Sequence, residues 1–497
     1  MGPIEENYTM CTLCTRRQFL SATAVGGAAL ASGSLLAQST GPTPAAPLSA
    51  SAPTGKVRIA VIFAGKAPDR SWSLSETEVA AITGKLAEVE KKIGNIEFVL
   101  GRATTAAETT ELLAKAGPDA PVLAVSSDIF GLSQGVIPTV FQQNRAVAVF
   151  HLPVIGGHDW CLVKPWRDKG HRITLFNTSD FNELEQAARL LRVVPLLGQS
   201  RVLVSPPFKG TPAAHTPAEV KQRLGVEMIT IPDGRYDEVM ATADTTAAER
   251  RADEWIEKAG DMLEPTREDV IKAARASLTL DKLIEENRAC GLCVGTCMGW
   301  LSRGFPCLGF TRLNDRGIPA ACDGDMDCLL TMLIMQHAIN RPGFLGNAAG
   351  VDTSRNVFHL SHCSAPLKME GPDGPAEPFL LRRHAEVRGG AVPEVHYRIG
   401  QTVTFTKLIH LKTLLVFTGK TVEVPPVPKG EERGCRTELI AEIRDAERLL
   451  ENWGGGALGD SAMDYYASLH RIAYYGDHVH TILHLGHLLG MDVVTEC

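Results

Sequence analysis

Three aspartates, Asp323, Asp325 and Asp327, stand within five positions near the start of the stretch from Cys322 to Cys363. An apolar segment follows them, and the stretch ends in a loop with histidines that include His362. Carboxylates on one loop and imidazoles on the next suit a hard or borderline divalent ion if the fold brings the loops together. The stretch therefore predicts a metal centre. Alternatively, Asp323 and Asp325 cap the following helix, because Asp is favoured at and just before a helix N-terminus.

Two other groups of residues offer metal chemistry. Cys290, Cys293 and Cys297 have the spacing of a zinc or iron–sulfur site, but no second pair or histidine at matching spacing accompanies them, which favours thiols buried at a crowded turn. Pairing within this group is the next alternative. His480 and His484 lie one helical turn apart, which could hold zinc in a metal hydrolase, but no HExxH pattern is present, and an interfacial or solvated stripe is favoured.

The first 55 residues predict export. Residues 15–20 read TRRQFL, and the run SATAVGGAALASGSLLA follows them. This pattern is typical of a bacterial twin-arginine signal peptide, predicted over residues 1–37, with a Pro/Ala/Ser-rich linker over 38–55. We therefore expect a periplasmic or otherwise exported protein, with no integral membrane span once the signal is removed. Ten of the twelve cysteines would remain after removal of Cys11 and Cys14, an even number that permits disulfides in an oxidising compartment.

The rest of the chain indicates an α/β protein of two or three domains, because 497 residues exceed one ordinary core. A net charge of −7 gives no basic footprint, which argues against nucleic acid as a partner. Apolar strands alternate with amphipathic helices, including helices expected near 182–192 and 268–287, and no GxGxxG indicates a dinucleotide. We predict two doubly wound parallel-sheet units and then a β-rich α+β domain, with boundaries at 56–168, 169–350 and 351–497, and helix over 460–497.

Four blocks carry a resemblance to a known family: GIPAACDGDMDCLLTMLIMQ, RPGFLGN, HLSHC and SLHRIAYYGDHVHTILHLGHLLGMDVV. In this order and spacing they resemble the L-fucose isomerase and L-arabinose isomerase superfamily. The matching blocks fall between residues 290–370 and 465–495, and the N-terminal half agrees in layout. The resemblance implies a fucose isomerase-like fold, a sugar as substrate and a homo-oligomer.

The resemblance also implies a ligand set for Mn²⁺. Asp323, Asn347 and His470 fall on the family's three ligand positions, and His362 matches a further histidine of the arabinose isomerases. The implied reaction is aldose–ketose isomerisation through an enediol, in which the cation binds two neighbouring sugar oxygens and two acids transfer a proton between carbons. His478 lies in the same block as His470 and is a candidate for binding substrate.

Two positions depart from the family pattern. Asp323 stands where the family usually has Glu, and Asn347 stands at the second acid, where its amide supplies neither charge nor a basic lone pair. Asp325 or Asp352 would then have to supply the missing carboxylate. Otherwise the protein is an exported carbohydrate-binding relative that has lost catalysis. Arg312 either contacts a sugar hydroxyl or forms an ion pair within its turn.

Overall fold

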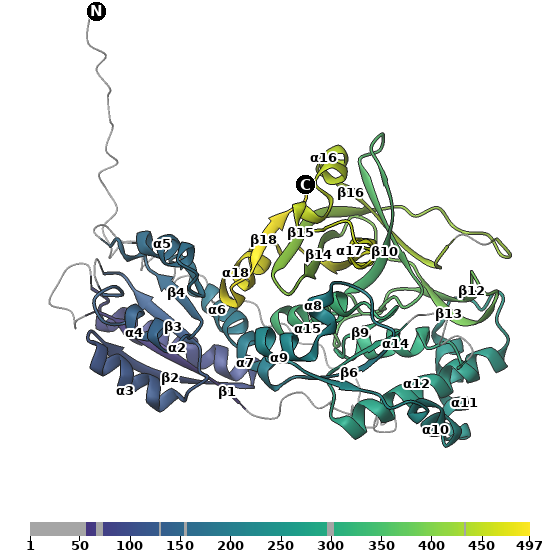
Figure 1. The fold of residues 1–497 in the computed structure, drawn as a ribbon, viewed down its shortest axis with the longest axis horizontal. Coiled ribbons are helices and arrows are strands. Elements are labelled where there is room, and N and C mark those ends of the chain that lie inside the picture. Colours follow the sequence, from purple (N-terminus) through teal and green to yellow (C-terminus); the bar gives the residue numbers. More distant parts are fainter. Residues whose placement is uncertain (1–55, 66–72, 129–130, 154–156, 296–302, 432–433) are drawn as a thin grey trace, which may run out of the picture. The chain divides into compact units, whose positions relative to one another are not determined.

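The computed structural model describes residues 56–65, 73–128, 131–153, 157–295, 303–431 and 434–497, all within one compact unit that spans Ser49–Cys497 (Figure 1). The predicted signal peptide and linker lie outside the described residues, as does Cys297. Within the described ranges, no helix combines the length and the apolar character that crossing a bilayer requires.

The first sheet has five parallel strands in the order β2-β1-β3-β4-β5. Alternate residues of β1, which lies between β2 and β3, face different cores: Ile59 and Val61 pack on one side, and Ala60 and Ile62 on the other. Both faces are covered, so this sheet is doubly wound as predicted. Its elements are β1 (Val57–Ala64), α2 (Glu76–Ile93), β2 (Ile96–Ala103), α3 (Ala106–Ala116), β3 (Val122–Ser126), α4 (Ile137–Gln142), β4 (Val147–His151), η1 (Asp159–Leu162), α5 (Val163–Asp168) and β5 (Ile173–Asn177).

Strand β5 corrects the predicted start of the second unit. It pairs in parallel with β4, from Val147↔Ile173 to His151↔Asn177, so the first sheet extends beyond residue 168. A continuous apolar run indicates a strand buried on both faces, but it does not indicate which sheet the strand joins.

A second parallel sheet has the order β7-β6-β8-β9. Val202 and Val204 of β6, one of its two inner strands, pack into one core and Leu203 into another, so this sheet is also covered on both faces. The helices expected near 182–192 and 268–287 are present as α6 and α12. The elements are α6 (Glu183–Leu191), α7 (Val193–Gln199), β6 (Arg201–Ser205), α8 (Pro212–His215), α9 (Pro217–Leu224), β7 (Glu227–Thr230), α10 (Arg235–Ala241), α11 (Thr245–Lys258), α12 (Arg267–Asn287), β8 (Gly291–Val294), α14 (Cys307–Asp315), β9 (Ala320–Ala321) and α15 (Met326–Ile339).

The C-terminal part is β-rich, as predicted, and its main sheet has seven strands in the order β14-β17-β10-β11-β16-β15-β18. All neighbours in this sheet are antiparallel except β15 and β18. Strand β10 belongs to it, so the boundary expected at residue 350 falls inside a strand. The strands are β10 (Phe344–Asp352), β11 (Val357–His362), β14 (Thr402–Ile409), β15 (Thr413–Val422), β16 (Thr437–Ile443), β17 (His470–Tyr475) and β18 (Asp492–Thr495), and β12 (Phe379–His384) pairs separately with β13 (Gly389–Val395).

The last segment is not continuously helical, contrary to the prediction for residues 460–497. Helices α17 (Ala462–Leu469) and α18 (Val479–Leu489) alternate with β17 and β18, and α16 (Ala446–Glu451) and the short η2 (Trp453–Gly456) precede them. His470 is therefore the first residue of a strand. The sequence RIAYY after it is rich in β-branched and aromatic side chains, which suit a buried strand.

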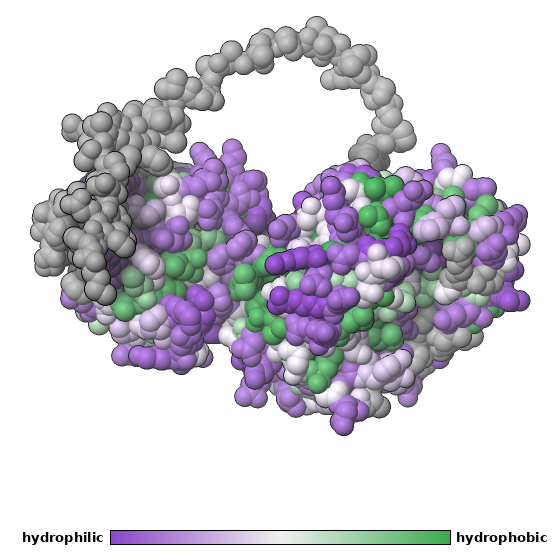
Figure 2. Space-filling view, turned by 90° about the horizontal axis from the view of Figure 1, so that it is seen from above, coloured by the Kyte–Doolittle hydropathy of each residue, from purple (hydrophilic) through white to green (hydrophobic). Residues whose placement is uncertain are grey.

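Large hydrophobic side chains are exposed at scattered positions. Figure 2 shows hydrophobic residues interspersed among hydrophilic ones on one face. Ile399 and Tyr465 are the most exposed of these side chains, at 63% and 64%, and they lie on separate segments. The homo-oligomer stays a prediction.

Candidate metal centre

The turn between β9 and α15 presents Asp323. Asp323 and Gly324 have φ angles of 61° and 72°, in the left-handed region. A Cβ on Gly324 would lie 2.4 Å from the carbonyl oxygen of Pro207, so only glycine fits there. Asp325 then caps α15, because its Oδ1 accepts a hydrogen bond of 2.9 Å from the amide of Cys328. The capping interpretation is therefore confirmed for Asp325, and Asp323 has a different role.

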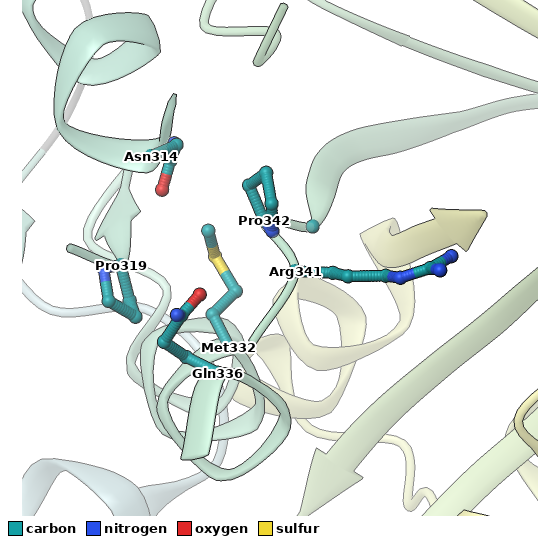
Figure 3. A pocket seen from close by; sticks show the side chains of 7 residues that line it. Asn314, Pro319, Met332, Gln336, Arg341 and Pro342 are labelled. Atoms are coloured by element: carbon teal, nitrogen blue, oxygen red, sulfur yellow. The ribbon is translucent and has the colours of Figure 1, made fainter. Parts of the chain in front are cut away.

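Asn314 at the end of α14 fixes the approach to this turn. Its Oδ1 accepts from the amide of Ala320 at 2.8 Å, and its Nδ2 donates to the carbonyl of the same residue at 3.2 Å. Figure 3 shows the crevice that Asn314 lines together with Met332 and Gln336. The empty volume of this crevice, about 150 Å³, is below the range of ordinary ligand pockets. Asn314 therefore acts through its hydrogen bonds to Ala320, which hold β9 in place.

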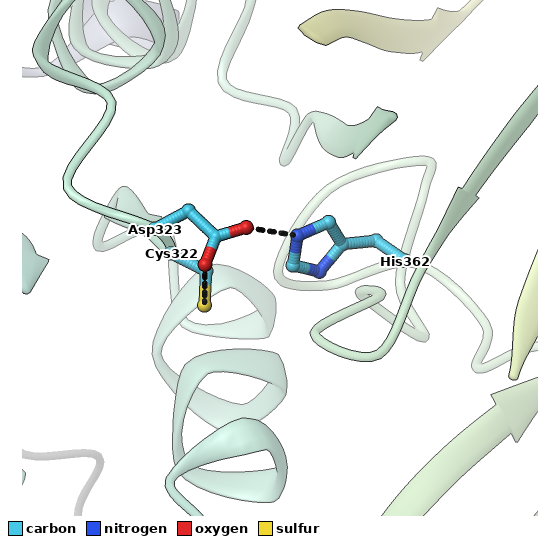
Figure 4. A group of neighbouring side chains, drawn as sticks. All are labelled: Cys322, Asp323 and His362. Atoms are coloured by element: carbon cyan, nitrogen blue, oxygen red, sulfur yellow. Dashed lines mark hydrogen bonds and ion pairs between the residues drawn. The ribbon is translucent and has the colours of Figure 1, made fainter. Parts of the chain in front are cut away.

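Two histidines meet the carboxylate of Asp323. The Oδ2 of Asp323 lies 3.5 Å from Nε2 of His362 and 3.8 Å from Nε2 of His470. The Sγ of Cys322 lies 4.0 Å from the other carboxylate oxygen, and Figure 4 shows Asp323 between Cys322 and His362. The two rings are 6.0 Å apart at their centroids. The end of β11, the start of β17 and the acidic turn thus converge on one group of potential ligands.

The hydrogen bonds of His470 leave its Nε2 facing this group. Nδ1 of His470 lies 2.8 Å from Oδ2 of Asp325. The pKa of Asp325 is lowered, because pairing with Lys407 and His470 outweighs its burial, so Asp325 is ionised and accepts. Nδ1 must then donate. Burial lowers the pKa of His470, so the ring is neutral and Nε2 carries a lone pair.

The lone pair on Nε2 of His470 indicates whether a cation fits beside Asp323. Nε2 of His470 is buried and has no hydrogen-bond partner among the described residues, and it faces the carboxylate of Asp323. Two electron-rich atoms facing each other in a buried site are unfavourable unless a positive charge lies between them. Nδ1 of His362 lies 3.1 Å from the hydroxyl of Ser364, an arrangement that would likewise direct Nε2 toward a metal. The residues therefore fit a divalent cation.

Lys407 lies beside a second group of potential ligands, which shares His470 with the proposed centre. Asp325, Cys328 and His470 also bring ligand atoms within 4.8 Å of one another. The Nζ of Lys407 lies 2.7 Å from Oδ2 of Asp325, and both side chains are fully buried. Burial opposes the charge of Lys407, but the carboxylate of Asp325 outweighs it and raises the pKa of the amine. An ammonium thus occupies the position that a cation would take in this second group.

Asp325 is consequently not placed to exchange protons with a ligand, although the sequence made it a catalytic candidate. Its neighbour Asp327 is also buried and accepts hydrogen bonds from the amide and the hydroxyl of Thr211. Burial and the nearby charge of Asp325 raise the pKa of Asp327 to about 7. The sequence alone did not indicate a role for Lys407. The available signal was a lysine within the strand TVTFTKLI, which is otherwise composed of threonine and apolar residues.

Asn347 lies beside the centre. In the pairing of β10 with β17, Asn347 stands directly opposite His470, so the two side chains are neighbours on one face of the sheet. Its Nδ2 lies 3.7 Å from the Sγ of Cys435. The structure thus brings together Asp323, Asn347, His362 and His470.

The structure places the candidate Asp352 elsewhere. It ends β10, five residues beyond Asn347, and its carboxylate accepts from the amides of Ser354 and Arg355 in a turn. The hydroxyl of Ser354 also donates to it, and these hydrogen bonds lower the pKa of Asp352. Asp352 is therefore not positioned to replace the missing acid.

His478 and Arg312 also lie away from the centre. His478 follows the far end of β17, with its Nε2 2.9 Å from the carbonyl oxygen of Tyr475, and it lines a separate cavity of about 350 Å³. Arg312 faces Asp281, with its Nε 3.7 Å from Oδ2. Arg251 and Arg316 approach the same carboxylate at 2.8 and 2.6 Å. Arg312 thus faces an acid of α12, and the ion pair expected within its own turn is not observed among the described residues.

The two remaining candidate groups are the histidine stripe of α18 and the cysteines at β8. His484 stacks on Phe176 at 4.3 Å between ring centroids and lies 2.6 Å from the hydroxyl of Thr174, which agrees with the interfacial alternative for the histidine stripe. Cys290 and Cys293 are free thiols, and Cys293 is buried in β8.

Comparison of the chain with protein-family models and with curated proteins finds no match.

Proposed function

We propose that this chain is a sugar isomerase-like protein that binds a divalent cation through Asp323, His362 and His470 and binds a carbohydrate at that cation. The unpaired lone pair on Nε2 of His470, facing the carboxylate of Asp323 at 3.8 Å, is the observation that carries the proposal. The resemblance to the fucose and arabinose isomerases supports a sugar as the ligand and Mn²⁺ as one candidate ion. When bound, the ion would supply Lewis-acid charge to two neighbouring sugar oxygens.

The residues around the centre favour binding without isomerisation. Isomerisation needs a base that removes a carbon-bound proton and an acid that returns it to the neighbouring carbon. Asn347 cannot serve as either at neutral pH. Asp325 is held by Lys407 and His470, and Asp352 is held in its own turn. Asp323 is then the carboxylate that remains at the centre.

Isomerisation is the second candidate, and the partial exposure of Asp323 favours it. The Asp323 side chain is 18% exposed, whereas those of His362 and His470 are 3% and 1% exposed. A carboxylate with this access could act as a base toward a bound sugar. In this case one acid would have to carry the proton in both directions.

One experiment separates the two candidates. The purified protein, freed of metal and then supplied with Mn²⁺ or Zn²⁺, is titrated with L-fucose and L-arabinose by calorimetry and incubated with each sugar in D₂O. We expect cation-dependent binding without ketose and without deuterium in the sugar. Ketose formation or deuterium incorporation would instead establish isomerisation. Asp323→Ala and His470→Ala should abolish cation binding, whereas Asp352→Ala should not, and stoichiometric metal in the first two variants would contradict the proposed centre.

Location and assembly are part of the same proposal. We propose export by the twin-arginine pathway on the basis of residues 15–20, so that the centre is loaded before the folded protein leaves the cytoplasm. A homo-oligomer follows from the resemblance.

A further inference from the structure

Cys322 adds a soft ligand atom to the proposed centre. Its Sγ, a carboxylate oxygen of Asp323 and a ring nitrogen of His362 all lie within 4.8 Å of one another. Cys322 is 2% exposed, so its thiol is buried beside the carboxylate. The family resemblance implies oxygen and imidazole ligands only, whereas this chain places a thiol beside the carboxylate.

We propose that Cys322 binds the cation as a thiolate together with Asp323, His362 and His470, and that the centre therefore prefers Zn²⁺ or Co²⁺ to Mn²⁺. This inference rests on the proposed cation centre. Binding breaks the S–H bond of Cys322 and forms a metal–sulfur bond, and the proton leaves to the solvent.

The distances agree with a compact set of three ligands, Cys322, Asp323 and His362, with His470 joined to it through Asp323. Around a tetrahedral zinc ion, bond lengths near 2.0–2.3 Å place ligand atoms about 3.3 to 3.6 Å apart. From Oδ2 of Asp323 the observed separations are 3.5 Å to His362 and 3.8 Å to His470, and Cys322 lies 4.0 Å from Oδ1 of the same carboxylate. Small side-chain movements would close these gaps. An octahedral Mn²⁺ site would require two more ligands, and Mn²⁺ prefers oxygen.

The charges of the ligand set also agree with a thiolate at Cys322. Asn347 stands where the family has a second acid and thus removes one negative charge from the ligand set. A thiolate at Cys322 restores that charge, so that one carboxylate and one thiolate balance a divalent ion. A site that lost its second carboxylate would bind a hard ion weakly, but the same site with a thiolate suits a borderline ion.

Cys328 provides the matched comparison. It is as buried as Cys322 and belongs to the group with Asp325 and His470. The ammonium of Lys407 already occupies that group, at 2.7 Å from Asp325. We therefore expect Cys322, and not Cys328, to contact the metal.

Cobalt spectroscopy tests the ligand directly. The full chain is stripped with a chelator and titrated with Co²⁺, and a thiolate bound to Co²⁺ gives a charge-transfer band in the near ultraviolet. We expect the band in the wild type and in Cys328→Ser, and its loss in Cys322→Ser. In competition titrations, Cys322→Ser should lower Zn²⁺ affinity at least about tenfold and Mn²⁺ affinity by less than about threefold. Cys322→Ala replaces the serine variant if the latter does not fold, as judged by circular dichroism.

The outcomes distinguish this inference from the proposed function. If Cys322→Ser keeps the charge-transfer band and the Zn²⁺ affinity of the wild type, the thiolate ligand is wrong. Cation binding that is still lost in Asp323→Ala and His470→Ala would then leave the centre itself intact. If the folded wild type binds neither Zn²⁺, Co²⁺ nor Mn²⁺, the inference and the proposed centre fail together.

Discussion

The ammonium of Lys407 lies 2.7 Å from the carboxylate of Asp325, and neither side chain is exposed to solvent. The same carboxylate caps α15 and accepts from Nδ1 of His470. One buried ion pair therefore connects the start of a helix, the strand β14 and the first residue of β17. Through the hydrogen bond to Nδ1, it also determines which nitrogen of His470 faces Asp323.

Removing Lys407 should strongly destabilise the fold. Lys407→Met leaves the carboxylate of Asp325 buried without its cation, and loss of one partner of a buried pair costs roughly 3–5 kcal/mol. Urea unfolding monitored by circular dichroism measures the change in the free energy of unfolding. The double variant Lys407→Met/Asp325→Asn should lose less stability than the sum of the two single variants, because it buries no unpaired charge. Additive losses would show that the two charges do not interact.

Restoring an acid opposite His470 should strengthen cation binding. Asn347→Asp places a carboxylate on the strand directly beside His470 and adds one negative charge to the centre. We expect the affinity for a divalent cation to rise about tenfold or more. Calorimetric titration of the metal-free protein measures this affinity.

Asp352→Asn is the matched control for that variant, because it removes a carboxylate at the far end of the same strand. Its cation affinity should equal that of the wild type. An unchanged affinity in Asn347→Asp would indicate that the side chain at 347 does not face the ion.

Arg312 should contribute little to binding or to stability. Its Nε is 3.7 Å from Asp281, which Arg251 and Arg316 approach more closely. Partly exposed ion pairs contribute at most about 1 kcal/mol, so Arg312→Ala should change the free energy of unfolding by less than about 0.5 kcal/mol. Arg316 lies closer to Asp281, at 2.6 Å, so Arg316→Ala should lower the free energy of unfolding by more than Arg312→Ala does. If Arg312 contacts a sugar, the alanine variant would instead weaken sugar binding in the calorimetric titration.

Local patterns predicted much of the fold. Helices α6 and α12 were predicted from the spacing of their apolar residues. Pairing across the chain was less predictable. Strand β5 has the composition of any buried parallel strand, and its sequence does not specify β4 as its neighbour.

At the site, too, residues marked by local patterns were predictable, whereas contacts between distant segments were not. The acidic turn and the resemblance indicated Asp323, His362, Asn347 and His470, and the structure brings these four residues together. Lys407 was missed because a lysine in a strand is normally read as solvent-exposed. Its burial depends on Asp325, which lies on a different element, and only the tertiary fold reveals such a pair.

The histidines of α18 should make stability depend on pH. Burial lowers the pKa values of His484 and His487 to about 4, and both rings contact Thr174 of β5. The unfolded chain, with histidine pKa values near 6.5, therefore takes up more protons than the folded chain between about pH 6.5 and 4. The stability that these neutral rings contribute is fully present above pH 6.5 and is lost as the pH falls toward 4. For His484 the loss between pH 8 and 5 should be about 2 kcal/mol.

Urea unfolding at pH 8 and pH 5 measures this difference in the wild type and in His484→Gln. The variant should lose less stability on acidification, because glutamine does not titrate. His480→Gln is a milder variant on the same helix: His480 is exposed, and its charge contributes less than burial to the lowered pKa of His484, so its replacement should reduce the pH dependence less than His484→Gln does. Equal pH dependence in all three proteins would show that the contact of His484 with Thr174 and Phe176 does not hold the ring neutral.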